Sequence, residues 1–137
     1  MGTEAFDVTQ PFDVAQLVIR IALAVAFIGM GIAHFLPGPG RTMAAMIPPF
    51  FRRPGWPSTK TLVRFTGVCE IAGGIGLLVP WLVVPAAIAL IVFLVAVFPA
   101  NARAAADPER FGAAAIPFWP RIAGQVVLIA LLALLLV

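Results

Sequence analysis

The chain of 137 residues is 62% hydrophobic and only 11% charged, with a mean hydropathy of +1.07. Soluble domains average about 25% charged residues, so this composition excludes an ordinary water-soluble domain and predicts a membrane protein. The net charge of +3 does not indicate nucleic-acid binding, because the basic residues border apolar runs instead of forming a soluble basic face.

Four apolar runs have the length of about 17–25 residues that a helix needs to cross a bilayer. They cover residues 15–36, 61–79, 82–99 and 118–137 and use most of the chain. We therefore predict a single domain over residues 1–137. Its fold class is an all-α integral membrane protein, a bundle of four transmembrane helices with an interfacial loop or short helix between the first two.

Prolines and glycines indicate where these helices begin and end. The sequence HFLPGPG (34–40) is expected to end the first helix, because Pro and Gly interrupt helical hydrogen bonding. Pro80 should close the second helix, and the sequence FPAN (98–101) should close the third. Pro117 and Pro120 should open the fourth, since proline fits the first turn of a helix.

The longest connection, residues 37–60, contains the sequence RTMAAMIPPFFRRPGW (41–56). This sequence predicts a segment in the membrane interface, with a short turn of helix and with its arginines on lipid headgroups. The side chains expected to face inward are apolar: Met43, Met46, Ile47, Phe50 and Phe51. Two interpretations are open here, a loop that rests on the membrane and a lid over a pocket.

The basic residues predict the orientation of the protein. Four crossings place both termini on one side, and that side, including the turn 79–85, contains no Lys or Arg. Apart from Arg20, inside the first run, every basic residue lies on the other side. Short basic loops remain in the cytoplasm. We therefore predict that both termini lie outside and that loops 37–60 and 100–117 lie in the cytoplasm; the resemblance described below implies that the membrane is the bacterial cytoplasmic membrane.

Glu70 is the one carboxylate deep within an apolar run. A charge near the bilayer centre costs roughly 2.5–3.5 kcal/mol on insertion scales, so such a group normally faces protein and has a partner. Gly67 and Gly74 share its helix face, and glycines allow a neighbouring helix to approach closely. We therefore expect Glu70 to face another helix, where Arg20 or Gln125 would hold it.

Four more polar residues are expected nearer the cytoplasm, one from each helix or helix end: His34, Arg64, Asn101 and Arg121. With Glu70, Arg20 and Gln125 they form a candidate buried polar network or ligand-binding site. Glu70 has three candidate roles: a clamp that fixes helix packing, a ligand or proton site, and a contact with another subunit. No metal site is expected, because a lone His without a nearby Cys, Asp or second His does not complete a tetrahedral site.

Several stretches follow a familiar pattern: FIGMGIAHF, MIPPFF, FTGVCEIAGGIGLLVP, VFPAN and FWPRIAGQVVLIA. In this order they resemble the DoxX-like family of small bacterial four-helix membrane proteins, over nearly the whole chain. The resemblance implies a left-handed four-helix bundle with functional interest at His34, Glu70, Asn101 and Arg121. It also implies a link to membrane redox complexes, because founding members are named for subunits of a thiosulfate:quinone oxidoreductase.

Two functions follow as hypotheses. The first is a non-catalytic accessory or anchoring subunit of a quinone-linked redox or respiratory complex, with the bilayer and other membrane subunits as partners. The alternative is a stand-alone binder or carrier of a small lipophilic molecule, such as a quinone or a lipid, in a pocket around Glu70. No intrinsic cofactor is expected. The sequence contains no evident catalytic constellation, so enzymatic activity, such as an isomerase with Glu70 as acid–base, stays open.

Overall fold

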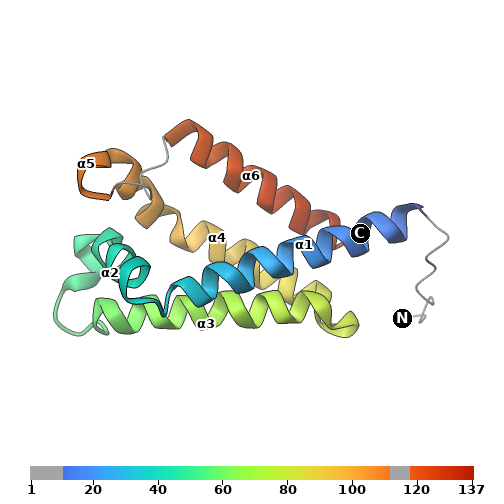
Figure 1. Ribbon diagram of the computed structural model, residues 1–137, viewed down its shortest axis with the longest axis horizontal. Helices are drawn as coiled ribbons and strands as arrows, with labels where there is room; N and C mark the ends of the chain where they lie inside the picture. Colours follow the sequence, from blue (N-terminus) through green and yellow to red (C-terminus); the bar gives the residue numbers. More distant parts are fainter. Residues whose placement is uncertain (1–10, 112–117) are drawn as a thin grey trace.

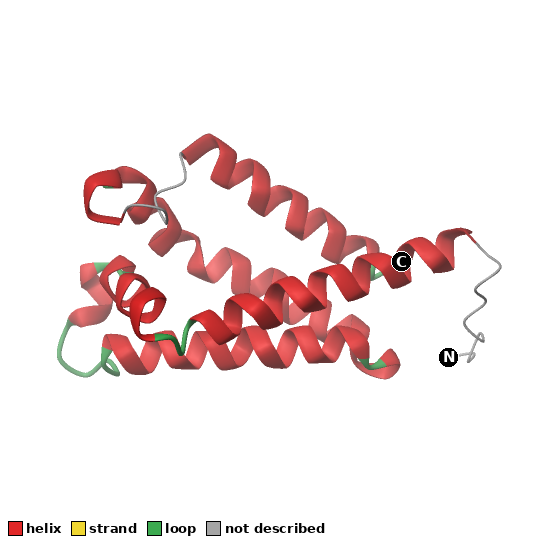
Figure 2. Cartoon of the chain, viewed as in Figure 1, coloured by secondary structure: helices red, strands yellow, loops and turns green. Residues whose placement is uncertain are grey.

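The computed structural model describes residues 11–111 and 118–137, and every regular element in these ranges is helical (Figures 1 and 2). The prediction of an all-helical protein is confirmed. The four long helices are α1 (Pro11–Ala33), α3 (Thr59–Leu78), α4 (Val83–Ala106) and α6 (Phe118–Leu134). The connections contain short elements: α2 (Pro37–Met46), α5 (Pro108–Phe111) and the 3-10 turns η1 (Pro49–Arg52) and η2 (Pro80–Leu82).

Three of the described segments are long and apolar enough to cross a membrane: Asp13–Ala33, Thr59–Leu78 and Pro80–Ala106. Large apolar side chains such as Val25 and Val92 are more than half exposed on these helices, which suits contact with lipid. The helix α6 is equally apolar but has 17 residues. At about 1.5 Å per residue it is roughly 26 Å long, against about 30 Å for a hydrocarbon core.

The Pro–Gly sequence at 37–40 begins a helix instead of forming a loop. The helix α1 ends at Ala33, and after a tight turn Pro37 opens α2, which has 10 residues. Prolines fit there because the N–H groups in the first turn of a helix have no intrahelical partner. The first helix therefore ends directly before the sequence HFLPGPG, as expected, and three residues before the approximate end at residue 36.

Pro99 lies inside α4, although the sequence predicted that this helix ends there. A proline inside a helix costs about 3 kcal/mol, so other contacts must compensate. Residues beyond Pro99 make these contacts with the segment between α1 and α3. Ala104 is fully buried and packs with Met46, and the Arg103 side chain donates a hydrogen bond to the Ile47 carbonyl oxygen. Tertiary contacts thus extend α4 to Ala106.

The remaining helix ends lie close to their predicted positions. The helix α3 ends at Leu78, two residues before Pro80, and Pro120 lies in the first turn of α6. Pro117 lies outside the described residues. The boundaries of these two helices are therefore set locally by proline, as expected.

Glycines bring the backbones of α1 and α3 together. A Cβ atom at Gly31 would lie 2.6 Å from Ile71 Cγ1 and 2.7 Å from the Gly67 carbonyl oxygen. A Cβ atom at Gly74 would lie 2.8 Å from Ile28 Cγ1. Carbon atoms do not approach other heavy atoms this closely, so the spacing between the two helices requires glycine at these positions.

One apolar core joins the four long helices, with Leu77, Leu90 and Leu132 fully buried in it. Near the C-terminal end of α6, Gln16 of α1 donates hydrogen bonds to the Leu134 and Val137 carbonyl oxygens. From there α1 and α6 diverge toward the end of the molecule that carries α2 and α5 (Figure 1). The candidate functional site lies in this wider half.

We expect Gly31→Ala to lower the free energy of unfolding by about 1–3 kcal/mol, because the added methyl group overpacks the α1–α3 contact. Gly29→Ala is the matched control, since nothing lies within 4 Å of its added Cβ atom. Thermal unfolding of both variants in detergent, followed by circular dichroism, measures the difference. Equal unfolding midpoints for the two variants would show that the glycine contact does not limit stability.

Candidate functional site

Glu70 is the one charged residue that is buried in the described part of the chain, with 7% of its surface exposed. Its carboxyl oxygen Oε2 lies 3.1 Å from Nδ1 of His34, in the turn that follows α1. Gly67 makes this approach feasible, because a Cβ atom there would lie 2.7 Å from His34 Cβ. The close contact of α1 and α3 therefore places an imidazole ring beside a buried carboxyl group.

The hydrogen bonds around His34 define which of its ring nitrogens carries a hydrogen. Nδ1 lies 2.7 Å from the Met30 carbonyl oxygen, which only accepts, so Nδ1 carries a hydrogen and donates it to Met30. Glu70 Oε2 faces the same N–H group without the alignment of a hydrogen bond, and no described residue satisfies this oxygen. A buried polar atom without a hydrogen bond typically costs about 1–3 kcal/mol.

The environment of His34 favours the neutral imidazole. His34 lies outside the membrane-length helix segment, which ends at Ala33. Burial lowers the pKa of the imidazole below its ordinary value, and the hydrogen bond to the Met30 carbonyl opposes this shift. A neutral ring with its hydrogen on Nδ1 has an acceptor at Nε2.

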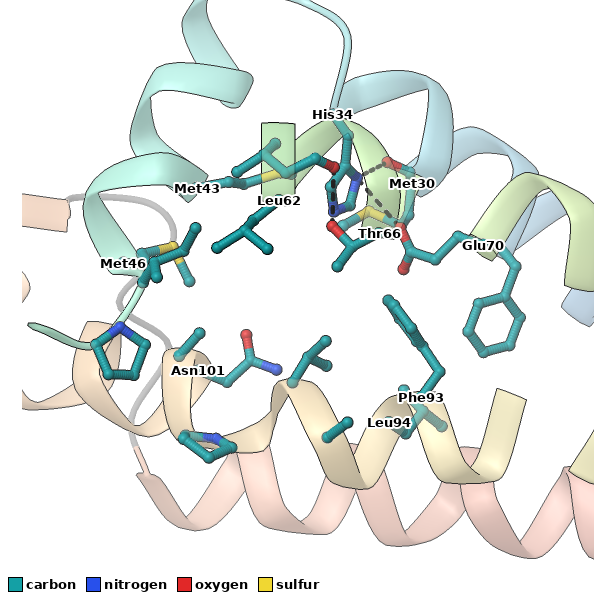
Figure 3. A pocket seen from close by; sticks show the side chains of 18 of the residues that line it. Met30, His34, Met43, Met46, Leu62, Thr66, Glu70, Phe93, Leu94 and Asn101 are labelled. Atoms are coloured by element: carbon teal, nitrogen blue, oxygen red, sulfur yellow. Dashed lines mark hydrogen bonds and ion pairs between the residues drawn. The ribbon is translucent and has the colours of Figure 1, made fainter. Parts of the chain in front are cut away.

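A cavity of about 570 Å³ begins at this pair (Figure 3). Ligand pockets in proteins typically measure about 300–1,000 Å³. Five polar side chains line the cavity: His34, Thr66, Glu70, Asn101 and Arg121. The other walls are mainly apolar and include three of the four methionines of the chain, Met30, Met43 and Met46. Methionine side chains are flexible and polarizable, so such walls adapt to ligands of different shape.

Four of the seven polar residues singled out in the sequence line this cavity: His34, Glu70, Asn101 and Arg121. Arg20 lies at the other end of α3, where its Nε donates to the Leu77 carbonyl oxygen at 2.9 Å. Arg64 is exposed, and neither Arg64 nor Gln125 lines the cavity. His34 is thus the side chain found beside Glu70, and the expectation that Arg20 or Gln125 holds the carboxyl group is wrong.

The stagger of α1 and α3 explains this difference. Gly31, near the end of α1, contacts Gly67 in α3, so residues 59–66 extend about two turns beyond the end of α1. Counting residues from the end of each predicted helix places His34 near the membrane surface and Glu70 near the middle of the membrane. The stagger places them side by side. Thr66, one helical turn before Glu70, was also overlooked in the sequence, although its spacing of four residues puts it on the same face.

The segment with α2 and η1 forms one wall of the cavity. Met43, Met46, Ile47 and Phe51 line it, which favours the lid interpretation over a loop that only rests on the membrane. Phe50 is 51% exposed, so the prediction that it faces inward is wrong. Its ring instead packs edge-on against the rings of Phe51 and Trp56.

Two arginines fix this wall in place. Arg52 is exposed, and its side chain turns back on α2 and donates to the carbonyl oxygens of Ala44, Ala45 and Ile47. Arg103 of α4 donates to the Ile47 carbonyl as well. The last carbonyl groups of a helix have no intrahelical donor, so these guanidinium groups satisfy the end of α2. They also tie the lid segment to α4.

The fold and the site define a class of protein: a small all-helical chain with three membrane-length apolar helices and a largely apolar cavity that holds a buried carboxyl group. The chain belongs to the family described as domain of unknown function DUF8561, which matches residues 23–136. The match includes all the residues that line the cavity. No match is found among curated proteins or among solved structures.

We expect Arg103→Ala to loosen the lid segment, because hydrogen bonds to charged donors contribute about 1.5–3 kcal/mol. Amide hydrogen exchange in residues 44–52 should accelerate by roughly tenfold or more, which corresponds to about 1.4 kcal/mol. Lys60→Ala, at an exposed position of α3, serves as the control for loss of a positive charge. Unchanged exchange in both variants would contradict the role of Arg103 as a tie between α4 and the lid.

Proposed function

We propose that the protein binds a small lipophilic molecule with a polar end in the cavity around Glu70 and His34. One observation carries this proposal: a buried carboxyl group, one oxygen of which has no hydrogen-bond partner, lines an apolar cavity of about 570 Å³. A carboxyl group that served only as a packing clamp would have its oxygens satisfied by the neighbouring helix. The combination of apolar walls and a few convergent polar groups is typical of ligand-binding sites.

The proposal places the protein in the bacterial cytoplasmic membrane with four crossings. In this arrangement α6 crosses together with the three membrane-length segments, and the residues after Leu134 complete its length. The distribution of basic residues supports termini outside and loops 37–60 and 100–117 in the cytoplasm. The pocket then lies in the cytoplasmic half of the bundle, under the lid segment.

Access from the lipid is supported by the exposure of several lining residues. Ala26 and Met30 of α1, and Ala96 and Pro99 of α4, line the cavity and are exposed. All four belong to membrane-length segments. The divergence of α1 from α6 widens the same half of the molecule (Figure 1). A molecule dissolved in the bilayer would thus reach the pocket without entering water.

The second candidate function is an accessory subunit of a quinone-linked membrane redox complex. It is supported by the resemblance of the sequence to DoxX-like proteins, whose implied positions of interest, His34, Glu70, Asn101 and Arg121, all line the cavity. In this case the cavity would border a quinone held jointly with a partner. Gentle purification of the tagged protein tests it, because a subunit copurifies with a stoichiometric partner that carries haem or flavin absorbance.

We expect the purified protein to retain a small apolar molecule that native mass spectrometry detects. Ala96→Phe should reduce the fraction of protein that carries the molecule by about tenfold or more, because the added ring occupies part of the cavity. A tenfold loss corresponds to about 1.4 kcal/mol of binding free energy. Ala123→Phe, on the exposed surface of α6, introduces the same ring outside the cavity. Equal retention in both variants would place the bound molecule elsewhere.

A further inference from the structure

We propose that the polar end of the bound molecule is a hydrogen-bond donor, a hydroxyl or an ammonium group, and that Glu70, His34 and Thr66 recognise it as acceptors. The inference rests on the proposed binding function and specifies the chemistry of the ligand. It follows from the hydrogen bonds that these side chains make within the protein.

Thr66 and His34 have already used their hydrogens, and Glu70 in its ionised form has none to offer. The Thr66 hydroxyl donates to the Val63 carbonyl oxygen at 2.8 Å. The Nδ1 hydrogen of His34 goes to the Met30 carbonyl oxygen, which leaves Nε2 as an acceptor in the neutral ring. Glu70 Oε2 faces that N–H group, as an acceptor does, but receives no hydrogen bond from any described residue. The acceptor capacity of this cluster therefore exceeds the donors available to it.

These acceptors lie together at one end of the cavity. Figure 3 shows the His34 ring, the Thr66 hydroxyl and the Glu70 carboxyl group gathered between α1 and α3, with Asn101 on the opposite wall. Met43 and Met46 approach from the lid segment on the far side. A ligand would therefore place its donor group beside Glu70 and its apolar chain along the methionines.

The same geometry argues against an acceptor end group beside Glu70, whereas Asn101 and Arg121 supply donors elsewhere on the cavity wall. A fatty acid would bring a second carboxylate beside Glu70, and like charges at such distances repel strongly in a poorly solvated site. An ether or ester oxygen would face acceptors without supplying a hydrogen, so the buried polar groups would stay unsatisfied. Sites built this way discriminate well against analogues that lack the required hydrogen.

Competition for a photoreactive probe tests the inference. The protein in detergent is labelled with a fatty alcohol that carries a diazirine in its chain, and labelled residues are mapped by mass spectrometry. Tetradecanol, tetradecylamine, methyl tetradecyl ether and tetradecanoic acid then compete with the probe. We expect the alcohol or the amine to suppress pocket labelling at concentrations about tenfold or more below those of the ether and the acid, as one unmet hydrogen bond implies. Whichever of the alcohol and the amine suppresses labelling at the lower concentration identifies the preferred donor group.

Variants test whether the named acceptors cause the discrimination. In Glu70→Gln the amide both donates and accepts, so the preference for alcohol over ether should fall to within about threefold. Glu109→Gln, an exposed acid of α5, should keep the full preference. Thr66→Val preserves the shape of the side chain but removes one acceptor. It should weaken competition by the alcohol and leave competition by the ether unchanged. This variant decides the matter if Glu70→Gln does not fold.

The outcomes separate this inference from the binding function. Pocket labelling that alcohol and ether suppress equally would overturn the donor requirement and leave the binding function intact. A preference for alcohol that survives both Glu70→Gln and Thr66→Val would overturn the assignment of these acceptors. Labelling confined to residues outside the cavity, combined with no retained molecule in native mass spectrometry, would overturn both proposals.

Discussion

The close contact between α1 and α3 at Gly31, Gly67 and Gly74 determines most of this structure. Because these three residues have no side chain, the two backbones come into contact, and this contact sets the stagger between the helices. The stagger in turn places the turn after α1 opposite the middle of α3, so that His34 meets Glu70. It also leaves the first turns of α3 free to pack beside α2, which becomes a wall of the cavity. In lipid there is no hydrophobic driving force between helices, so such close backbone packing is a principal source of association.

The glycine contacts between α1 and α3 bear on the role of Glu70. The glycines already hold α1 against α3, so the carboxyl group is not needed to join these helices. Arg20 contributes to the same interface independently, through the Leu77 carbonyl at the other end of α3. Glu70 instead lies where the packing ends and the cavity begins, with an oxygen that no described residue satisfies. Retaining a polar group at this cost is typical of functional sites in membrane proteins.

Helices and their apolar character were accessible from the sequence, because long apolar runs and proline positions are local signals. The burial of Glu70 was equally accessible, since its helix face carries Gly67 and Gly74. The partner of Glu70 could not be predicted from the sequence. The position of a residue along its own helix does not show how α1 and α3 are shifted against each other, and this shift is set by the contact of Gly31 with Gly67. The continuation of α4 past Pro99 was missed for a related reason: Ala104 and Arg103 make contacts with α2 that no local pattern contains. Of the seven polar positions selected from the sequence, His34, Glu70, Asn101 and Arg121 line one cavity, whereas Arg20, Arg64 and Gln125 do not.

The exposed lining residues Ala26, Met30, Ala96 and Pro99 have a consequence for how occupancy would be controlled. A site that fills from the bilayer responds to the mole fraction of its ligand among the lipids, not to the aqueous concentration. Partitioning concentrates a lipophilic molecule in the membrane, so the pocket would fill even when the molecule is a minor lipid component. The protein would then report or buffer membrane composition rather than sequester a scarce compound.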